Sequence, residues 1–131
     1  MKIVLASVQS DLRLALEMLF REQPGTDVVG TATETEGLLA LIQTTRPDLV
    51  LLDCDLPGRP CAQVLAQIQT ADCVPAFIIL GRKASAEGPL LAAGAGAFVL
   101  KGDPPQRLLA AVERVRSQQR VYQDRVPARE E

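Results

Sequence analysis

Five short apolar segments alternate with five segments of helical periodicity, and this order leaves few folds open to the chain. The apolar segments lie at residues 2–6, 27–31, 49–52, 76–80 and 96–100. Apolar residues at helical spacing predict helices from about residue 10 and at 36–45, 61–70, 84–93 and 103–119. Short connections between such elements predict an α/β protein of the (βα)5 type. Its central five-stranded parallel sheet would carry helices on both faces.

Length and charge bound the organisation of the chain. Its 131 residues suit one domain with one core, which we expect over residues 1–120. Residues 121–131 are predicted to be a polar tail, or the start of a linker to an output domain absent from this chain. The net charge of −2 provides no basic field for nucleic acid, so DNA would be bound only through that absent domain. No stretch is long enough to span a membrane, and we predict a cytoplasmic location.

The cysteines do not predict a metal site or a disulfide framework. Cys54, Cys61 and Cys73 form no CxxC pair, and the sequence contains no histidine. A zinc site would therefore lack its usual ligands. We expect three reduced, partly buried thiols in a cytosolic protein.

Polar residues follow several of the predicted strands. In a parallel α/β sheet, ligands bind at the carboxyl ends of the strands, where the strand order reverses. Those ends carry Ser7 and Val8, Asp53, Gly81 with Arg82, and Lys101. The sequence therefore predicts a functional site at this edge of the sheet.

Several segments in this order resemble a known family. LVLLDCDLPG (49–58) and AAGAGAFVLK (92–101) resemble the response-regulator receiver domain, and MKIVLA and VPAFIIL match its first and fourth strands. DVVG (27–30) and residues 100–115 resemble the branch that carries a LuxR-type DNA-binding domain. The resemblance implies the flavodoxin-like receiver fold and a role in two-component phosphorelay signalling and transcription regulation. It also implies a protein partner, either a histidine kinase or another regulator, and a homodimer.

The resemblance also implies roles for single residues. In the family, an aspartate at the end of the third strand accepts a phosphoryl group. An acidic pair after the first strand holds Mg²⁺, and a lysine and a hydroxyl share the charge. By position, Asp53 matches the phospho-acceptor, Lys101 the lysine and Phe98 the aromatic switch position. Asp55 lies where the family places a backbone carbonyl on the metal.

Three positions depart from the family pattern. Ser7 and Val8 stand where the acidic pair should be, Gly81 replaces the hydroxyl residue, and Arg82 replaces a small residue. With Asp53 and Asp55 as the remaining acidic ligands, we expect no cofactor, or weak Mg²⁺ at most. We hypothesise that Arg82 lies over Asp53, with Lys101 as a further point charge, so that an ion pair replaces the metal.

The leading prediction is thus an atypical, or pseudo-, receiver that acts by protein interaction and is not an enzyme. One alternative is a conventional receiver, phosphorylated on Asp53 by a histidine kinase. For Phe98 the two interpretations are a switch residue and plain core. For Arg82 they are contact with Asp53 and a side chain that simply points to solvent. A second alternative is an unrelated flavodoxin-like nucleotide or flavin binder. It is disfavoured because residues 7–10 (SVQS) contain no glycine for a phosphate-cradling loop.

Overall fold

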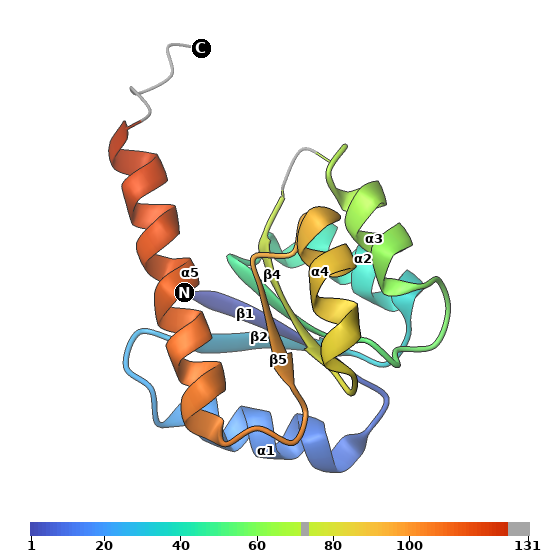
Figure 1. The fold of residues 1–131 in the computed structure, drawn as a ribbon. Coiled ribbons are helices and arrows are strands. Elements are labelled where there is room, and N and C mark those ends of the chain that lie inside the picture. The colour runs from blue at the N-terminus through green and yellow to red at the C-terminus, as the bar shows by residue number, and fades with distance from the viewer. Residues whose placement is uncertain (72–73, 126–131) are drawn as a thin grey trace.

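A parallel sheet of five strands runs through the middle of the computed structural model, with helices on both of its faces (Figure 1). The structure describes residues 1–71 and 74–125, and for residues 119–125 the backbone alone. The strands are β1 (Lys2–Ala6), β2 (Asp27–Ala32), β3 (Leu49–Asp53), β4 (Ala76–Gly81) and β5 (Ala97–Leu100). They pair in the order β2–β1–β3–β4–β5, all parallel. The predicted α/β fold with a five-stranded parallel sheet is confirmed.

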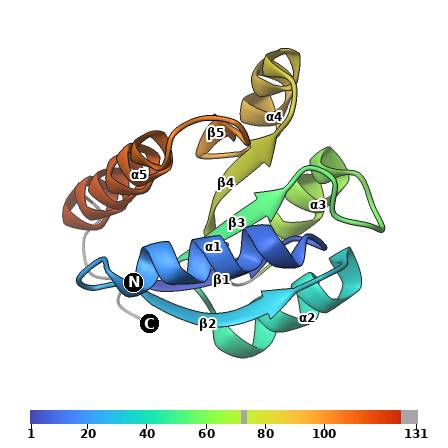
Figure 2. The same cartoon turned by 90° about the horizontal axis from the view of Figure 1, so that it is seen from below.

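The helices divide between the two faces of the sheet. One face is covered by α1 (Ser10–Arg21) and α5 (Pro105–Arg125). The other is covered by α2 (Thr35–Thr45), α3 (Cys61–Ile68) and α4 (Glu87–Ala92). Figure 2 shows α5 and α3 well separated on opposite sides of the strands. The sheet therefore has no solvated face.

Strand β3 shows why the sequence favours this arrangement. Successive side chains of a strand point to opposite faces. Leu49 and Leu51 pack with the α1 and α5 residues, whereas Val50 and Leu52 pack with those of α2, α3 and α4. All five residues of the strand are buried, and each fully buried aliphatic side chain stabilises the fold by about 1.5–3 kcal/mol. This packing fixes the position of the residue that ends the strand, Asp53.

The largest differences from the predicted elements concern the last two helices. The helix expected at 84–93 begins as a 3-10 turn, Ala84–Ala86, and Pro89 lies in the first turn of α4, where a missing N–H costs little. Helix α5 continues to Arg125, beyond the predicted end near Gln119, so part of the expected tail is helical. The rest of that tail, residues 126–131, lies outside the described residues.

The helices also bear on membrane association. None of those in the described part of the chain combines the length and the apolar character that crossing a bilayer requires.

Candidate functional site

Four strand ends bring the predicted residues together at the carboxyl edge of the sheet. Strands β1 and β3 are neighbours, and the chain moves from β1 outward to β2 and then back across to β3. The strand order therefore reverses at the β1–β3 pair, where crevices form in open α/β sheets. Ser7 follows β1, Asp53 ends β3, Gly81 ends β4, and Lys101 follows β5.

Asp53 is a carboxylate without solvent exposure, and both of its oxygens have partners. The Lys101 ammonium lies 2.7 Å from Oδ1. The backbone N–H of Asp55 donates to the same oxygen at 2.8 Å. The Ser7 hydroxyl donates to Oδ2 at 2.7 Å. Burying a carboxylate costs several kcal/mol unless charge and hydrogen bonds compensate it, and here all three partners do so.

Ser7 has a role that the sequence did not predict. Its side chain is buried, and its hydroxyl accepts from the backbone N–H of Gln9 at 3.1 Å while donating to Asp53. The Arg13 guanidinium donates to the Ser7 carbonyl at 2.8 Å, which ties α1 to this loop. Ser7 is thus a hydrogen-bond donor to the acceptor-position carboxylate. Val8, by contrast, is 49% exposed.

Arg82 does not cover Asp53, so that hypothesis was wrong. Its Nε donates to Oδ2 of Asp55 at 2.8 Å, and its side chain is 68% exposed. Lys101, only 15% exposed, lies within 3.0 Å of the same Asp55 oxygen while also contacting Asp53. The physical reason is burial: the long Arg82 side chain leaves the end of β4 toward solvent, whereas Lys101 reaches the enclosed carboxylate. An ion pair is present, but Lys101 provides its cation.

These contacts shift two pKa values in opposite directions. The hydrogen bond from Lys101 holds the pKa of Asp55 below its usual value, and the charges of Lys101 and Arg82 lower this pKa further. Partial burial of the carboxyl group acts in the opposite direction but is outweighed. Burial by itself lowers the pKa of Lys101, but hydrogen bonds and charges from Asp53 and Asp55 outweigh it and raise the pKa. Both groups are therefore held in their charged forms at neutral pH.

The residues present do not fit a magnesium site. Mg²⁺ takes about six oxygen ligands in near-octahedral geometry. In the described part of the chain, no group of three or more acidic, Cys or His residues could hold a metal ion. The two nearby carboxylates, Asp53 and Asp55, already share the Lys101 ammonium. At the end of β1 a metal would meet only Ser7 and Val8, which carry no carboxylate.

Phe98 occupies the space beside Gly81. A Cβ atom added to Gly81 would lie 2.6 Å from two atoms of the Phe98 ring, closer than side-chain carbons approach. The ring is half-buried and packs against the core formed with α2, α3 and α4. The predicted switch position thus packs as core, and the volume of the expected hydroxyl side chain is taken by the ring.

Thr35 joins the loop after Asp53 to α2 by hydrogen bonds, a role that the sequence did not predict. Thr35 is buried; its N–H donates to the Pro57 carbonyl, and its hydroxyl accepts from the N–H of Arg59. Gly58 lies between them with φ of 113°, and a Cβ there would collide with the Thr35 hydroxyl. A threonine at the start of a helix is a common capping residue. The sequence alone therefore did not indicate that Thr35 also contacts the loop after Asp53.

Two of the three cysteines are described. Cys54 and Cys61 are free and partly buried, as predicted, and burial together with the neighbouring Cys54 raises the pKa of the Cys61 thiol. Such a thiol is a poor nucleophile. Cys73 lies outside the described residues.

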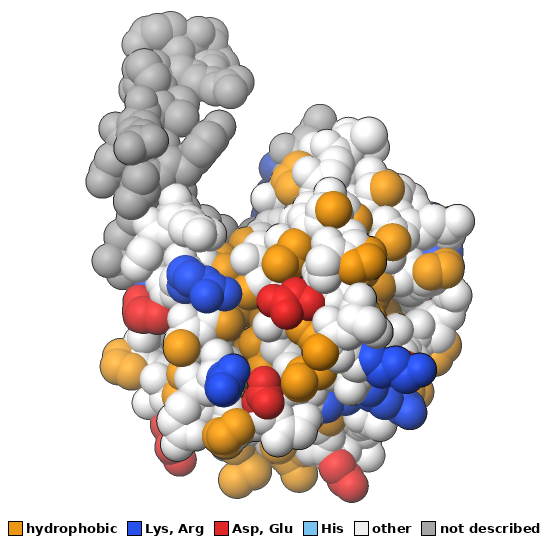
Figure 3. All heavy atoms as spheres, viewed as in Figure 1, with side chains coloured by type: hydrophobic (Ala, Val, Ile, Leu, Met, Phe, Trp, Pro, Cys, Tyr) orange, Lys and Arg blue, Asp and Glu red, His pale blue; other side chains and the backbone are white. Residues whose placement is uncertain are grey.

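The surface gives no sign of a continuous basic tract on the face seen in Figure 3. There, basic side chains lie in small groups separated by acidic and apolar ones.

Comparison with known proteins decides the family. Residues 3–113 match the family described as "Response regulator receiver domain". The chain belongs to this family. The alternative of an unrelated flavodoxin-like module is thereby excluded, and the chain is the receiver domain of a two-component response regulator. A LuxR-family response regulator is among the structures that it matches, as the resemblance implied.

Individual relatives agree with this assignment. The chain is 33% identical over 111 residues to "Uncharacterized transcriptional regulatory protein YhcZ" of Bacillus subtilis, covering 83% of this chain and 52% of the relative. It is 26% identical over 115 residues to the nitrate/nitrite response regulator NarL of Escherichia coli, covering 86% and 53%. The chain thus spans about half the length of these curated relatives.

A solved receiver has the same fold. The signal receiver domain of a LuxO repressor protein from Vibrio parahaemolyticus superimposes with a TM-score of 0.85, covering 98% of each chain at 21% identity. A LuxR-family response regulator from Aurantimonas has a TM-score of 0.79 at 27% identity, covering 87% of this chain and 83% of that one.

The buried ion pair predicts a large effect of Lys101→Met. Removing the cation leaves the Asp53 carboxylate buried without its counter-charge, and we expect the free energy of unfolding to fall by about 3 kcal/mol at pH 7. Urea denaturation would measure it, with the exposed Lys83→Met as the matched control. Arg82→Met should cost less than about 1 kcal/mol, since its pair is exposed. Equal losses for Lys101→Met and Arg82→Met would contradict this assignment.

The same pair predicts a dependence on alkaline pH. The pKa of Lys101 is raised above its usual value of 10.5 in the folded state. Its contribution to stability is therefore complete below pH 10.5 and is lost as the pH rises through the raised folded-state pKa. The difference between wild type and Lys101→Met should shrink in that range. A difference that stays constant there would mean that the ammonium charge is not what stabilises the site.

The contact between Gly81 and Phe98 predicts non-additive substitutions. Gly81→Ala should destabilise the fold by about 1–3 kcal/mol, because the new methyl group meets the ring. In a Phe98→Leu background this loss should become much smaller. Gly102→Ala, which adds a methyl group into open space, is the control. Strictly additive losses in thermal or urea denaturation would show that the ring does not fill this space.

Proposed function

We propose that this chain is an atypical receiver in which an internal ion pair stands in place of the metal, so that Mg²⁺-dependent phosphorylation of Asp53 is impaired. The observation that carries the proposal is the occupation of both Asp53 oxygens, by Lys101 and Asp55 N–H on one side and Ser7 on the other. The domain would then act as a regulatory interaction module and not as an enzyme.

Phosphoryl transfer to a carboxylate explains why these contacts matter. The attacking oxygen must approach a dianionic phosphoryl group, and this requires cations that neutralise the charge in the transition state. Asp53 has no solvent exposure. The end of β1 supplies no second metal-binding carboxylate, because Ser7 and Val8 stand there. The end of β4 supplies no hydroxyl, because Gly81 ends that strand.

The relatives suggest the setting. NarL is a response regulator and YhcZ a transcriptional regulatory protein, each about twice as long as the matched region. We therefore place this domain in a cytoplasmic transcription regulator, with a histidine kinase or another regulator as its protein partner. DNA contact would belong to a separate output domain.

The test is phosphorylation by a small donor. The 131-residue chain is incubated with acetyl phosphate and Mg²⁺ and then analysed by intact-mass spectrometry, beside a receiver that retains both acidic residues after its first strand. We expect the control to gain a phosphoryl adduct and this chain to remain unmodified. A stoichiometric adduct that disappears in Asp53→Asn would establish the conventional receiver instead.

Phosphorylation could be impaired because carboxylate ligands are missing after β1 or because Lys101 blocks the metal, and a gain-of-function variant separates these two causes. Ser7→Asp combined with Val8→Asp restores carboxylates at the end of β1 and removes the hydroxyl that holds Asp53. If the missing ligands are the cause, Mg²⁺ should bind at least tenfold more tightly in calorimetric titration, since each carboxylate adds a hard oxygen ligand. Unchanged affinity would show that Lys101 alone blocks the metal.

A further inference from the structure

Cys54 and Cys61 stand at the two ends of the loop that follows Asp53. Cys54 comes directly after β3, and its backbone N–H donates to the Leu80 carbonyl of β4 at 2.9 Å. Cys61 is the first residue of α3. Both side chains are partly buried and pack against the hydrophobic cluster on the face of the sheet that α2, α3 and α4 cover. The two thiols therefore share one face of the sheet and remain open in part to solvent.

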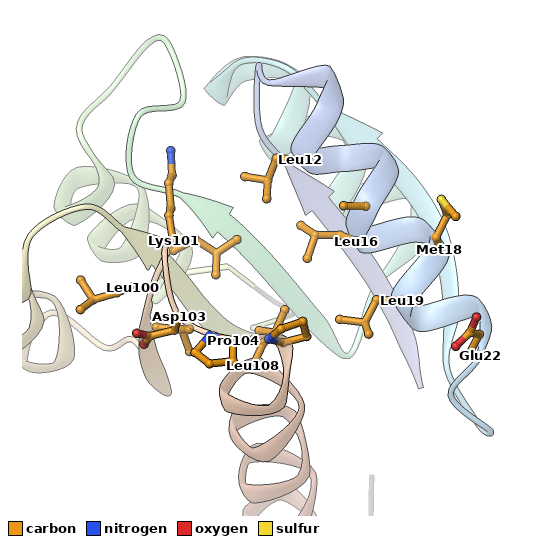
Figure 4. A pocket seen from close by; sticks show the side chains of 14 residues that line it. Leu12, Leu16, Met18, Leu19, Glu22, Leu100, Lys101, Asp103, Pro104 and Leu108 are labelled. Carbon is orange, nitrogen blue, oxygen red and sulfur yellow. The ribbon is translucent and has the colours of Figure 1, made fainter.

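The two thiols are in contact with each other. A hydrogen bond joins the side chains of Cys54 and Cys61, and a disulfide requires sulfur atoms that face each other at such short range. The apolar groove between α1 and the start of α5 lies on the opposite face of the sheet, where Figure 4 shows Leu12, Leu16 and Leu19 extending from α1 toward α5. Neither cysteine lines that groove, so a molecule bound in it would not cover the thiols.

Backbone hydrogen bonds bring the two ends of the loop together. The N–H of Leu56 donates to the Asp53 carbonyl at 3.0 Å, which turns the chain directly after β3. The N–H of Thr35 donates to the Pro57 carbonyl at 3.0 Å, which ties the middle of the loop to α2. Gly58 follows with φ of 113°, a conformation that glycine adopts at little cost. The contact between the thiols is therefore set by the backbone of the loop.

The same loop carries Asp55, the residue that follows Cys54. Its N–H donates to Oδ1 of Asp53 at 2.8 Å. Its carboxylate lies 3.0 Å from the Lys101 ammonium and 2.8 Å from Nε of Arg82. A covalent bond that closed the loop would therefore restrict the residue that connects Asp53 to both cations.

We propose that Cys54 and Cys61 form a reversible oxidation site, at which a low-molecular-weight disulfide converts the two thiols into an intramolecular disulfide. The Cys54 sulfur attacks the small disulfide, which gives a mixed disulfide and releases one small thiol. The Cys61 sulfur then attacks the Cys54 sulfur and releases the second small thiol. The two cysteines lose two electrons, the small disulfide gains them, and both S–H protons end on the released thiols.

The surroundings of Cys61 determine how this bond should behave. Burial raises the pKa of the Cys61 thiol, and the adjacent Cys54 thiol and the carboxylates of Asp53 and Asp55 raise it further. Oxidation should therefore be slow, because the thiolate is the nucleophile. Reduction of the disulfide must release the same disfavoured thiolate, so the bond should also break slowly. The disulfide itself carries no charge for the carboxylates to repel.

Equilibration of the folded 131-residue chain in glutathione buffers tests the proposal. Cys73→Ser leaves two cysteines in the chain, and the wild-type chain is measured in parallel. After the remaining free thiols are blocked, intact-mass spectrometry should show the loss of two hydrogen atoms, and peptide mapping should join Cys54 to Cys61. A stable glutathione adduct on one cysteine, or free thiols in fully oxidised glutathione, would overturn the proposal.

The denatured chain provides the control for closeness in sequence. In concentrated urea, the equilibrium constant for forming the disulfide should be at least roughly tenfold lower than in the folded chain, because the fold no longer holds the two sulfur atoms together. A constant that is equal or larger in urea would show that the folded loop does not favour the bond, against the proposal.

Amide hydrogen exchange measures the effect on the site. Oxidation should slow exchange at the Asp55 amide by roughly threefold or more, because a closed loop opens less often. Cys61→Ala in the Cys73→Ser background, treated with the same buffers, should show no change, and circular dichroism confirms its fold. Unchanged exchange at Asp55 in the oxidised chain would show that the bond does not constrain the site.

The oxidation site does not depend on the proposed function. Phosphorylation by acetyl phosphate is measured with the thiols kept reduced, and disulfide formation is measured without phosphate or metal. Either idea can therefore fail alone.

Discussion

The carboxylate at the end of β3 has no contact with water, and its charge must be balanced by the groups that the other strands bring to it. Lys101 supplies the opposite charge from the end of β5, and Ser7 supplies a hydroxyl from the end of β1. The hydrogen bond from Ser7 therefore links the central strand β3 to its neighbour β1, and the ion pair with Lys101 links it to the edge strand β5. The arrangement of this end of the sheet depends on the contacts of Asp53 with Lys101 and Ser7.

A lysine and a metal ion can each neutralise the charge of a buried carboxylate, but with different consequences. A bound Mg²⁺ keeps several waters and leaves room for an incoming phosphoryl group. An ammonium is tethered to the chain and carries one charge, so it satisfies the resting carboxylate without leaving open coordination positions. Asp55 extends this network outward, because it contacts both Lys101 and the exposed Arg82. Two carboxylates, Asp53 and Asp55, thus meet the cations of Lys101 and Arg82 at this edge of the sheet.

Much of the fold was predictable because a strand buried on both faces is apolar along its length, as β3 is from Leu49 to Leu52. Asp53 and the end of β5 lie at the same edge of the sheet because the strands are parallel. Lys101 was placed correctly for the same reason. The role of Arg82 was not, because the direction of a long exposed side chain depends on local competition between two carboxylates. Ser7, Arg13 and Thr35 were missed as supports because their hydrogen bonds join segments far apart in sequence. The length of α5 was underestimated because its final turns are polar.

The ring of Phe98 filling the space beside Gly81 has a consequence for any substitution at these two positions. A larger side chain at position 81 and the ring would compete for one volume. A hydroxyl residue could be accommodated at position 81 only together with a smaller side chain at position 98 or a rearrangement of the ring. Packing therefore constrains the two positions as a pair.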